Sequence, residues 1–82
     1  MPRYFIDTDD GDTHVHDDEG RVLPDDAAAR LAAQAALPDM ARDKLPGGDA
    51  RNLVAMVRNE TGDLLYTVTM ALVGAWKVSP PA

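Results

Sequence analysis

The sequence predicts a small α+β protein of the order ββαββ, in which a four-stranded antiparallel sheet carries one helix on one face. Three observations support this fold class. An alanine-rich stretch, 21–48, contains helix start and stop signals and apolar residues at helical spacing. Short runs rich in apolar residues precede and follow it, and turns that contain glycine separate these runs. We expect one domain over residues 1–74 and a flexible tail over 75–82.

The N-terminal part is predicted to form a β-hairpin. Residues 2–8 carry aromatic and β-branched side chains, which favour a strand. A turn at 9–11 ends in glycine and sends the chain back along 13–17, the second expected strand. A second turn at 18–20 and the short segment 21–23 then lead to the helix.

The helix is expected to begin at Asp25 and to end before Pro46. A carboxylate at the cap accepts from exposed backbone amides and suits the positive end of the helix dipole. Two apolar stripes run along the helix. The stripe expected to face the sheet consists of Leu31, Ala35, Pro38, Ala41 and Leu45. The second stripe, which we expect another subunit to approach, consists of Ala33, Leu37, Met40 and Lys44.

Pro38 lies inside this predicted helix. A proline there removes one hydrogen bond and clashes with the carbonyl of Gln34, at a cost of about 3 kcal/mol. Two outcomes follow: the helix kinks, or it ends near Ala36 and a second short helix begins at Pro38. We therefore expect a kinked or broken helix.

Two further strands are predicted at 51–58 and 64–73, joined by a hairpin turn at 59–62. Alternation places Leu53, Ala55 and Val57 on one face of the third strand. The fourth strand is expected to point Tyr66, Val68, Met70 and Leu72 inward, and Thr67, Thr69 and Ala71 outward.

Composition makes several functional classes improbable. The chain has no cysteine, so disulfides, thiolate zinc sites and cysteine nucleophiles are excluded. It has no apolar run long enough to cross a membrane, so a cytoplasmic protein is expected. Its net charge is −6, with nine acidic and two basic residues in 1–26 and five against six in 27–82. Such a surface repels phosphate backbones, so nucleic acid binding is not expected, whereas a basic protein is a suitable partner.

His14, His16 and Asp17 are the candidate metal ligands. Side chains two residues apart on a strand project to the same side, so the two imidazoles could reach one divalent ion while a carboxylate completes the set. The alternative, non-functional interpretation is that these are exposed polar residues of a strand. The neighbouring acidic run does not match a calcium-binding loop.

No catalytic or cofactor site is expected. The hydroxyl residues lack a nucleophile-elbow motif, and the PGGD segment lacks the lysine of a phosphate-binding loop. We therefore expect a non-enzymatic protein without a cofactor.

A homodimer is the expected assembly. Thirteen alanines leave few large side chains for a core, so a second copy would add stability. The fourth strand is long and carries no charge, and cells usually cover such an edge. The candidate interface residues are Leu37, Met40, Thr67, Thr69 and Trp76.

The chain resembles a family of small uncharacterised proteobacterial proteins that are classified as a domain of unknown function. The resemblance covers residues 2–73 and rests on the opening MPRYFID, the D-E-G-x-x-L-P-D run at 18–25, and the ARDxLPGG segment at 41–48. It implies an α+β protein without assigned activity. This chain departs from the family pattern at Ile6, where a phenylalanine is common, and at Pro38.

A looser resemblance is to antitoxin domains of HicB type. It is carried by a hairpin that leads through Leu23, Pro24 and Asp25 into a helix that begins D-A-A. The resemblance implies an inhibitor of a small basic toxin, although a third strand before the helix and the DNA-binding appendage are missing. The sequence thus leaves the function open between a homodimeric interaction or regulatory module, a HicB-like inhibitor, and a weak metal-binding protein.

Overall fold

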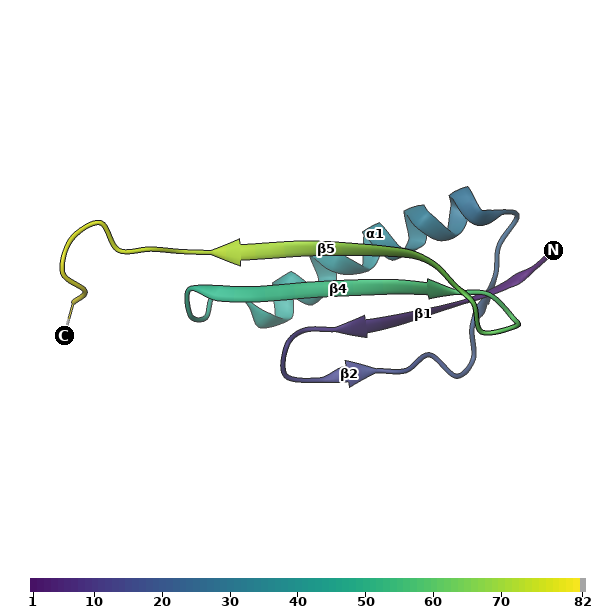
Figure 1. Ribbon diagram of the computed structural model, residues 1–82, viewed down its shortest axis with the longest axis horizontal. Helices are drawn as coiled ribbons and strands as arrows, with labels where there is room; N and C mark the ends of the chain where they lie inside the picture. Colours follow the sequence, from purple (N-terminus) through teal and green to yellow (C-terminus); the bar gives the residue numbers. More distant parts are fainter. Residues whose placement is uncertain (82) are drawn as a thin grey trace.

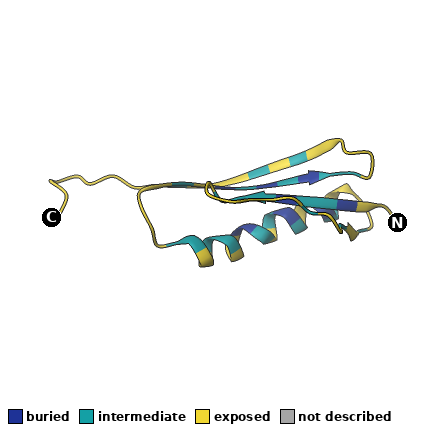
Figure 2. Cartoon of the chain, turned by 90° about the horizontal axis from the view of Figure 1, so that it is seen from below, coloured by how far each residue is buried: buried dark blue, intermediate teal, exposed yellow. Residues whose placement is uncertain are grey.

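The computed structural model describes residues 1–81 and contains one helix and five strands. Their bounds are Arg3–Asp9 (β1), His14–Val15 (β2), Arg21–Val22 (β3), Asp26–Lys44 (α1), Ala50–Arg58 (β4) and Leu64–Val73 (β5). Strands β2, β1, β4 and β5 lie side by side in that order, every pair antiparallel, and α1 covers one face of the sheet (Figures 1 and 2). The predicted α+β fold is confirmed.

The core lies between α1 and the central strands. On β4 the predicted alternation is confirmed, because Leu53, Ala55 and Val57 are all buried against the helix. Small side chains on both surfaces let the helix backbone approach the sheet closely. The buried hydrophobic residues are Tyr4, Ala29, Ala33, Leu37, Leu53, Ala55 and Val57.

The predicted cap of α1 is confirmed. The Asp25 carboxylate accepts a hydrogen bond from the amide of Ala28 at 2.9 Å. At the other end the amide of Leu45 donates to the carbonyl of Ala41 at 2.8 Å, and the helix stops before Pro46. Local capping chemistry therefore sets both helix ends.

The face of α1 that packs on the sheet differs from the prediction. Ala29, Ala33 and Leu37 are buried, whereas Leu31 is 62% exposed. The second of the two predicted stripes therefore faces the sheet. The expectation for the first was wrong for its first three residues, which are exposed, whereas Ala41 packs against the core. Alanine occurs all around this helix, so its sequence is only weakly amphipathic and does not specify which side the sheet will cover.

The helix continues through Pro38 without interruption from Asp26 to Lys44. The alternative of a break with a second short helix is therefore wrong. Pro38 is exposed, so its ring lies on the solvent-facing side of the helix. The neighbouring Leu37 remains packed in the core.

We expect Pro38→Ala to raise the free energy of unfolding by about 1–2 kcal/mol, because alanine restores the missing helical hydrogen bond. Chemical denaturation of the two proteins measures this difference. Pro38→Gly is the matched control and should gain about 1 kcal/mol less, since glycine is a poor helix former. A lower unfolding midpoint for Pro38→Ala would contradict the expectation.

The return strand along β1 is interrupted. Pairing occurs at His14–Val15 and resumes at Arg21–Val22, so the predicted strand 13–17 is shorter and the segment before the helix adds a fifth strand. Between them, residues 16–20 form a loop, called the 16–20 loop below. Its Asp17 carboxylate accepts from the amide of Ile6 at 3.0 Å and replaces a strand partner there.

The chain beyond β5 extends away from the sheet (Figure 1). The amide of Gly74 donates to the carbonyl of Asp49 at 2.6 Å, and the following residues are exposed. Trp76 is 57% exposed. Ala82, the last residue of the predicted tail, lies outside the described residues. Over the described range, α1 does not have the length and apolarity that a membrane-spanning helix needs.

Candidate functional site

A polar cluster lies on the sheet face opposite the helix, where β1 meets β4. The Arg58 Nε donates to Asp7 Oδ2 at 2.6 Å, and its Nη2 donates to Asp7 Oδ1 at 3.0 Å. The same Nη2 donates to the backbone oxygen of Asp17 at 3.0 Å. The guanidinium also lies 5.1 Å from the centre of the Phe5 ring. One bidentate pair thus joins β1, β4 and the 16–20 loop.

Hydrogen bonding controls the charges of this cluster. The Arg58 guanidinium holds the pKa of Asp7 below its usual range, and the Asp7 carboxylate raises the pKa of Arg58 in return. Burial pushes the pKa of Asp17 up, but hydrogen bonds from the amides of Gly20, Ile6 and Glu19 outweigh burial and lower it overall. All three groups are therefore held in their charged forms and serve to lock the loop onto β1.

Tyr4 anchors the start of the helix from inside the core. Its hydroxyl donates to the Asp26 carboxylate at 2.6 Å, and this hydrogen bond raises the pKa of Tyr4 to about 12. The phenol therefore stays neutral and acts as a donor rather than as a base.

The predicted metal ligands do not converge. His14 Nδ1 lies 3.4 Å from Asp9, whereas His16 lies 3.6 Å from both Asp7 and Asp18. The Asp17 carboxylate is already committed to backbone amides. Among residues 1–81, no group of three or more histidine or acidic side chains is placed to hold a metal ion. The metal hypothesis therefore gains no geometric support.

The two edges of the sheet differ in whether other segments of the chain cover them. Along β1, the outer edge is covered by β2, β3 and the Asp17 carboxylate. At the opposite edge lies β5, Leu64–Val73, which pairs with β4 on one side and with no other strand of residues 1–81. The exposed edge is therefore a ten-residue strand without a charge or a proline.

The chain matches a known protein family over a range that includes both edges of the sheet. A family model described as a domain of unknown function, DUF6894, matches residues 3–71. The chain belongs to this family. The match spans the helix and almost the whole sheet, which confirms the resemblance to an uncharacterised family. No curated protein and no solved structure matches the chain.

The predicted interface residues of this DUF6894 chain fall into two groups. Leu37 is buried in the chain's own core and therefore offers no surface to a second chain, whereas Met40 packs against that core and is only partly buried. Thr67 and Thr69 are exposed on the edge strand, on the face away from the helix, and Trp76 is exposed on the tail.

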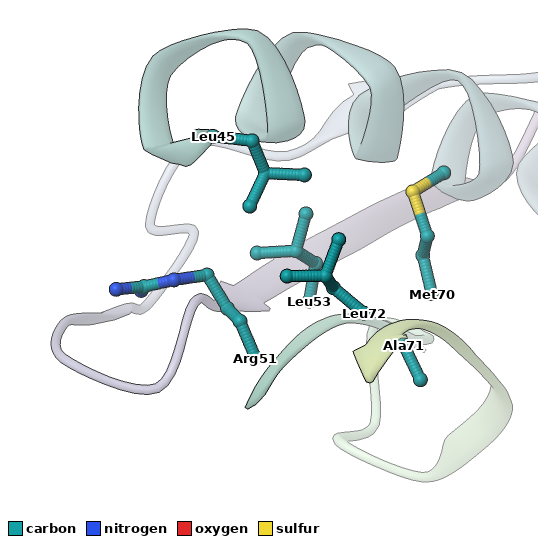
Figure 3. A pocket seen from close by; sticks show the side chains of 6 residues that line it. All are labelled: Leu45, Arg51, Leu53, Met70, Ala71 and Leu72. Atoms are coloured by element: carbon teal, nitrogen blue, oxygen red, sulfur yellow. The ribbon is translucent and has the colours of Figure 1, made fainter. Parts of the chain in front are cut away.

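An apolar hollow lies between the end of α1, the start of β4 and the end of β5 (Figure 3). Its volume is about 90 Å³, whereas pockets for drug-sized ligands measure about 300–1,000 Å³. The guanidinium of Arg51, at its rim, donates to the carbonyl of Asp10 at 2.7 Å. The hollow is therefore too small for a typical organic cofactor in this DUF6894 domain. Its lining residues are Leu45, Arg51, Leu53, Met70, Ala71 and Leu72.

The Asp7–Arg58 ion pair was not predicted from the sequence. Alternation places Asp7 and Phe5 on one face of β1, but the register that brings Arg58 opposite Phe5 appears only when the strands pair. The available signal was an acid directly after the apolar run Tyr4–Ile6 in a predicted strand, because a charge that becomes buried there requires a partner.

Proposed function

We propose that this DUF6894 chain is a small, acidic, non-enzymatic interaction module of the cytoplasm that acts as a homodimer joined through β5. One observation carries the proposal: the sheet closes its β1 edge and leaves the long, uncharged β5 edge without a partner. Unpaired backbone groups on such an edge readily accept another strand, and natural monomers usually block them with charges, prolines or bulges.

A second copy of β5 is a suitable partner for this edge. Antiparallel pairing about a two-fold axis perpendicular to the sheet would join the two sheets and place both helices on the same face. The register of β5 shifts opposite Val57 and Arg58, and its regular part, 66–73, gives an edge of roughly 26 Å at about 3.3 Å per residue, enough for a ladder of hydrogen bonds.

The helix side of β5 also favours a partner. Helix α1 packs more closely on β4 than on β5, so Tyr66 and Val68 are only partly buried and Met70 is exposed. In the proposed dimer, the same half-covered strip of each copy would meet at the axis and exclude water there.

Sedimentation velocity at tens of micromolar tests the proposal, with a dimer as the expected species. The double variant Thr67→Lys/Thr69→Lys places like charges from both copies near the axis. Both threonines are exposed, so the fold of the monomer should persist. We expect the dissociation constant to rise at least tenfold, which corresponds to about 1.4 kcal/mol.

The matched control is Leu31→Lys/Ala35→Lys. It adds the same charge on the exposed side of the helix and should leave the dissociation constant unchanged. A wild-type monomer at tens of micromolar, or equal weakening by both double variants, would refute the β5 dimer.

A second candidate is a HicB-like inhibitor of a small basic protein. One observation supports it: β3 supplies a short strand before the helix, an element that was not predicted from the sequence. Three acidic side chains in the loops that follow β1, Asp12, Asp18 and Glu19, are exposed and suit a basic partner. A pull-down from the native host separates the candidates, because a stoichiometric small basic protein supports the inhibitor and self-association alone supports the module.

A further inference from the structure

We propose that in the β5 dimer the tail of each chain, residues 74–79, docks against the other copy where β5 begins, with Trp76 as the anchor. This inference rests on the homodimer proposed above and specifies a second contact within it. The tail is then part of the interface and no longer an unattached extension.

The direction of the tail supports this placement. It continues the course of β5 beyond the body of the domain (Figure 1). In an antiparallel pair, the residues after one strand lie beside the residues before the other strand. A two-fold axis at Val68 or Thr69, the middle of β5, brings the residues that follow Gly74 level with the turn before the partner subunit's Leu64. Either register delivers the indole to the turn that precedes β5.

The receiving surface is apolar and open. Leu64 is 61% exposed and Leu65 is 40% exposed, and both lie where the pairing of β5 with β4 shifts register. Beside Leu65, an open hollow of about 270 Å³ lies between the first turn of α1 and the start of β5. Its lining residues are Asp26, Ala27, Arg30, Val57, Leu65 and Tyr66.

The tail has complementary chemistry. Trp76 and Val78 are exposed large apolar side chains, and tryptophan is among the residues that most often anchor protein interfaces. Lys77 is the one basic residue between them, and the turn before β5 carries Glu60 and Asp63. Apolar and charged groups of the tail would therefore meet matching groups of the other copy.

The fluorescence of Trp76 tests the inference, because Trp76 is the only tryptophan of the chain. At concentrations where the full chain is a dimer, we expect emission at shorter wavelength and protection from iodide quenching. Dilution into the monomer range should shift the emission to longer wavelength and remove the protection. The Thr67→Lys/Thr69→Lys variant should show the exposed emission at every concentration at which it is a monomer.

Leu65→Ala locates the receiving surface. We expect it to reduce the protection of Trp76 in the dimer at least twofold, whereas Val22→Ala, at the opposite edge of the sheet, should have no effect. A wild-type dimer whose Trp76 is fully quenched would overturn the tail contact and leave the β5 dimer standing. A monomer at every concentration would overturn both.

Discussion

Replacing Asp7 by asparagine is expected to lower the free energy of unfolding by about 2–3 kcal/mol. The Asp7 side chain is 8% exposed and accepts two hydrogen bonds from Arg58 and one from the amide of Asp17. Asparagine keeps the shape but removes the charge that neutralises the guanidinium. Breaking a fully buried pair costs about 3–5 kcal/mol, and the lower figure applies here because Arg58 retains 22% of its exposure to water.

The loss of unfolding free energy caused by Asp7→Asn should depend on pH. The pKa of Asp7 in the folded chain lies below its ordinary value of 3.8, so the unfolded chain binds the proton more tightly. The stability that the pair contributes is therefore complete above about pH 3.8 and declines as the pH falls through the folded pKa. Urea unfolding at pH 7 should show the full difference between the two proteins, and the difference should narrow in acid.

Asp18→Asn is the matched control for this substitution. It makes the same chemical change on a side chain that is 86% exposed, so the unfolding free energy should change by less than about 0.5 kcal/mol. Equal effects of the two substitutions, or a difference for Asp7→Asn that stays constant down to pH 2, would argue against the ion pair as the cause.

Gly20→Ala is expected to destabilise the chain by about 2–3 kcal/mol. Gly20 has a φ of +72°, where an L side chain is strained. A Cβ there would also lie 2.9 Å from the Tyr4 carbonyl oxygen, 2.9 Å from a Phe5 ring carbon and 3.0 Å from the Arg3 Cγ. Since the Tyr4 contact is with backbone, the 16–20 loop would have to move away from β1.

Gly62→Ala separates the effect of backbone strain at a positive φ from the effect of close contacts around the new Cβ. Gly62 has a φ of +88°, but a Cβ there would meet nothing within 4 Å. Only the backbone strain of about 1 kcal/mol should remain. Thermal or urea unfolding of both variants measures the difference, and an equal loss of stability in both would show that the close approach at Gly20 carries no extra cost.

Together Asp7 and Gly20 explain why one sheet edge is closed. Gly20 lets the 16–20 loop approach β1, and Asp7 and Asp17 then bind the loop with backbone hydrogen bonds. A variant that loosens the loop would uncover the amide of Ile6 and give the sheet a second open edge. Closure at β1 therefore leaves β5 as the open edge of the described sheet, on which the proposed self-association depends.

Much of the fold follows from the sequence alone. Period-two alternation and the glycine turn located β5 at Leu64–Val73 and β4 within one residue of its observed start. The Asp25 cap and the Pro-Gly-Gly stop located the helix. These features are local, because each depends on backbone preferences and hydrogen bonds between residues close together in the chain. The DUF6894 family membership follows from the same stretch of sequence.

Tertiary structure decided what local signals leave open. The alanine-rich helix has apolar residues on every side, so only contact with the sheet selected Ala33 and Leu37 over Leu31 as its buried face. The partner of Asp7 lies 51 residues away, and strand pairing alone brings it into reach. The free edge at β5 is likewise a property of strand order, which depends on how the hairpins assemble rather than on any one of them.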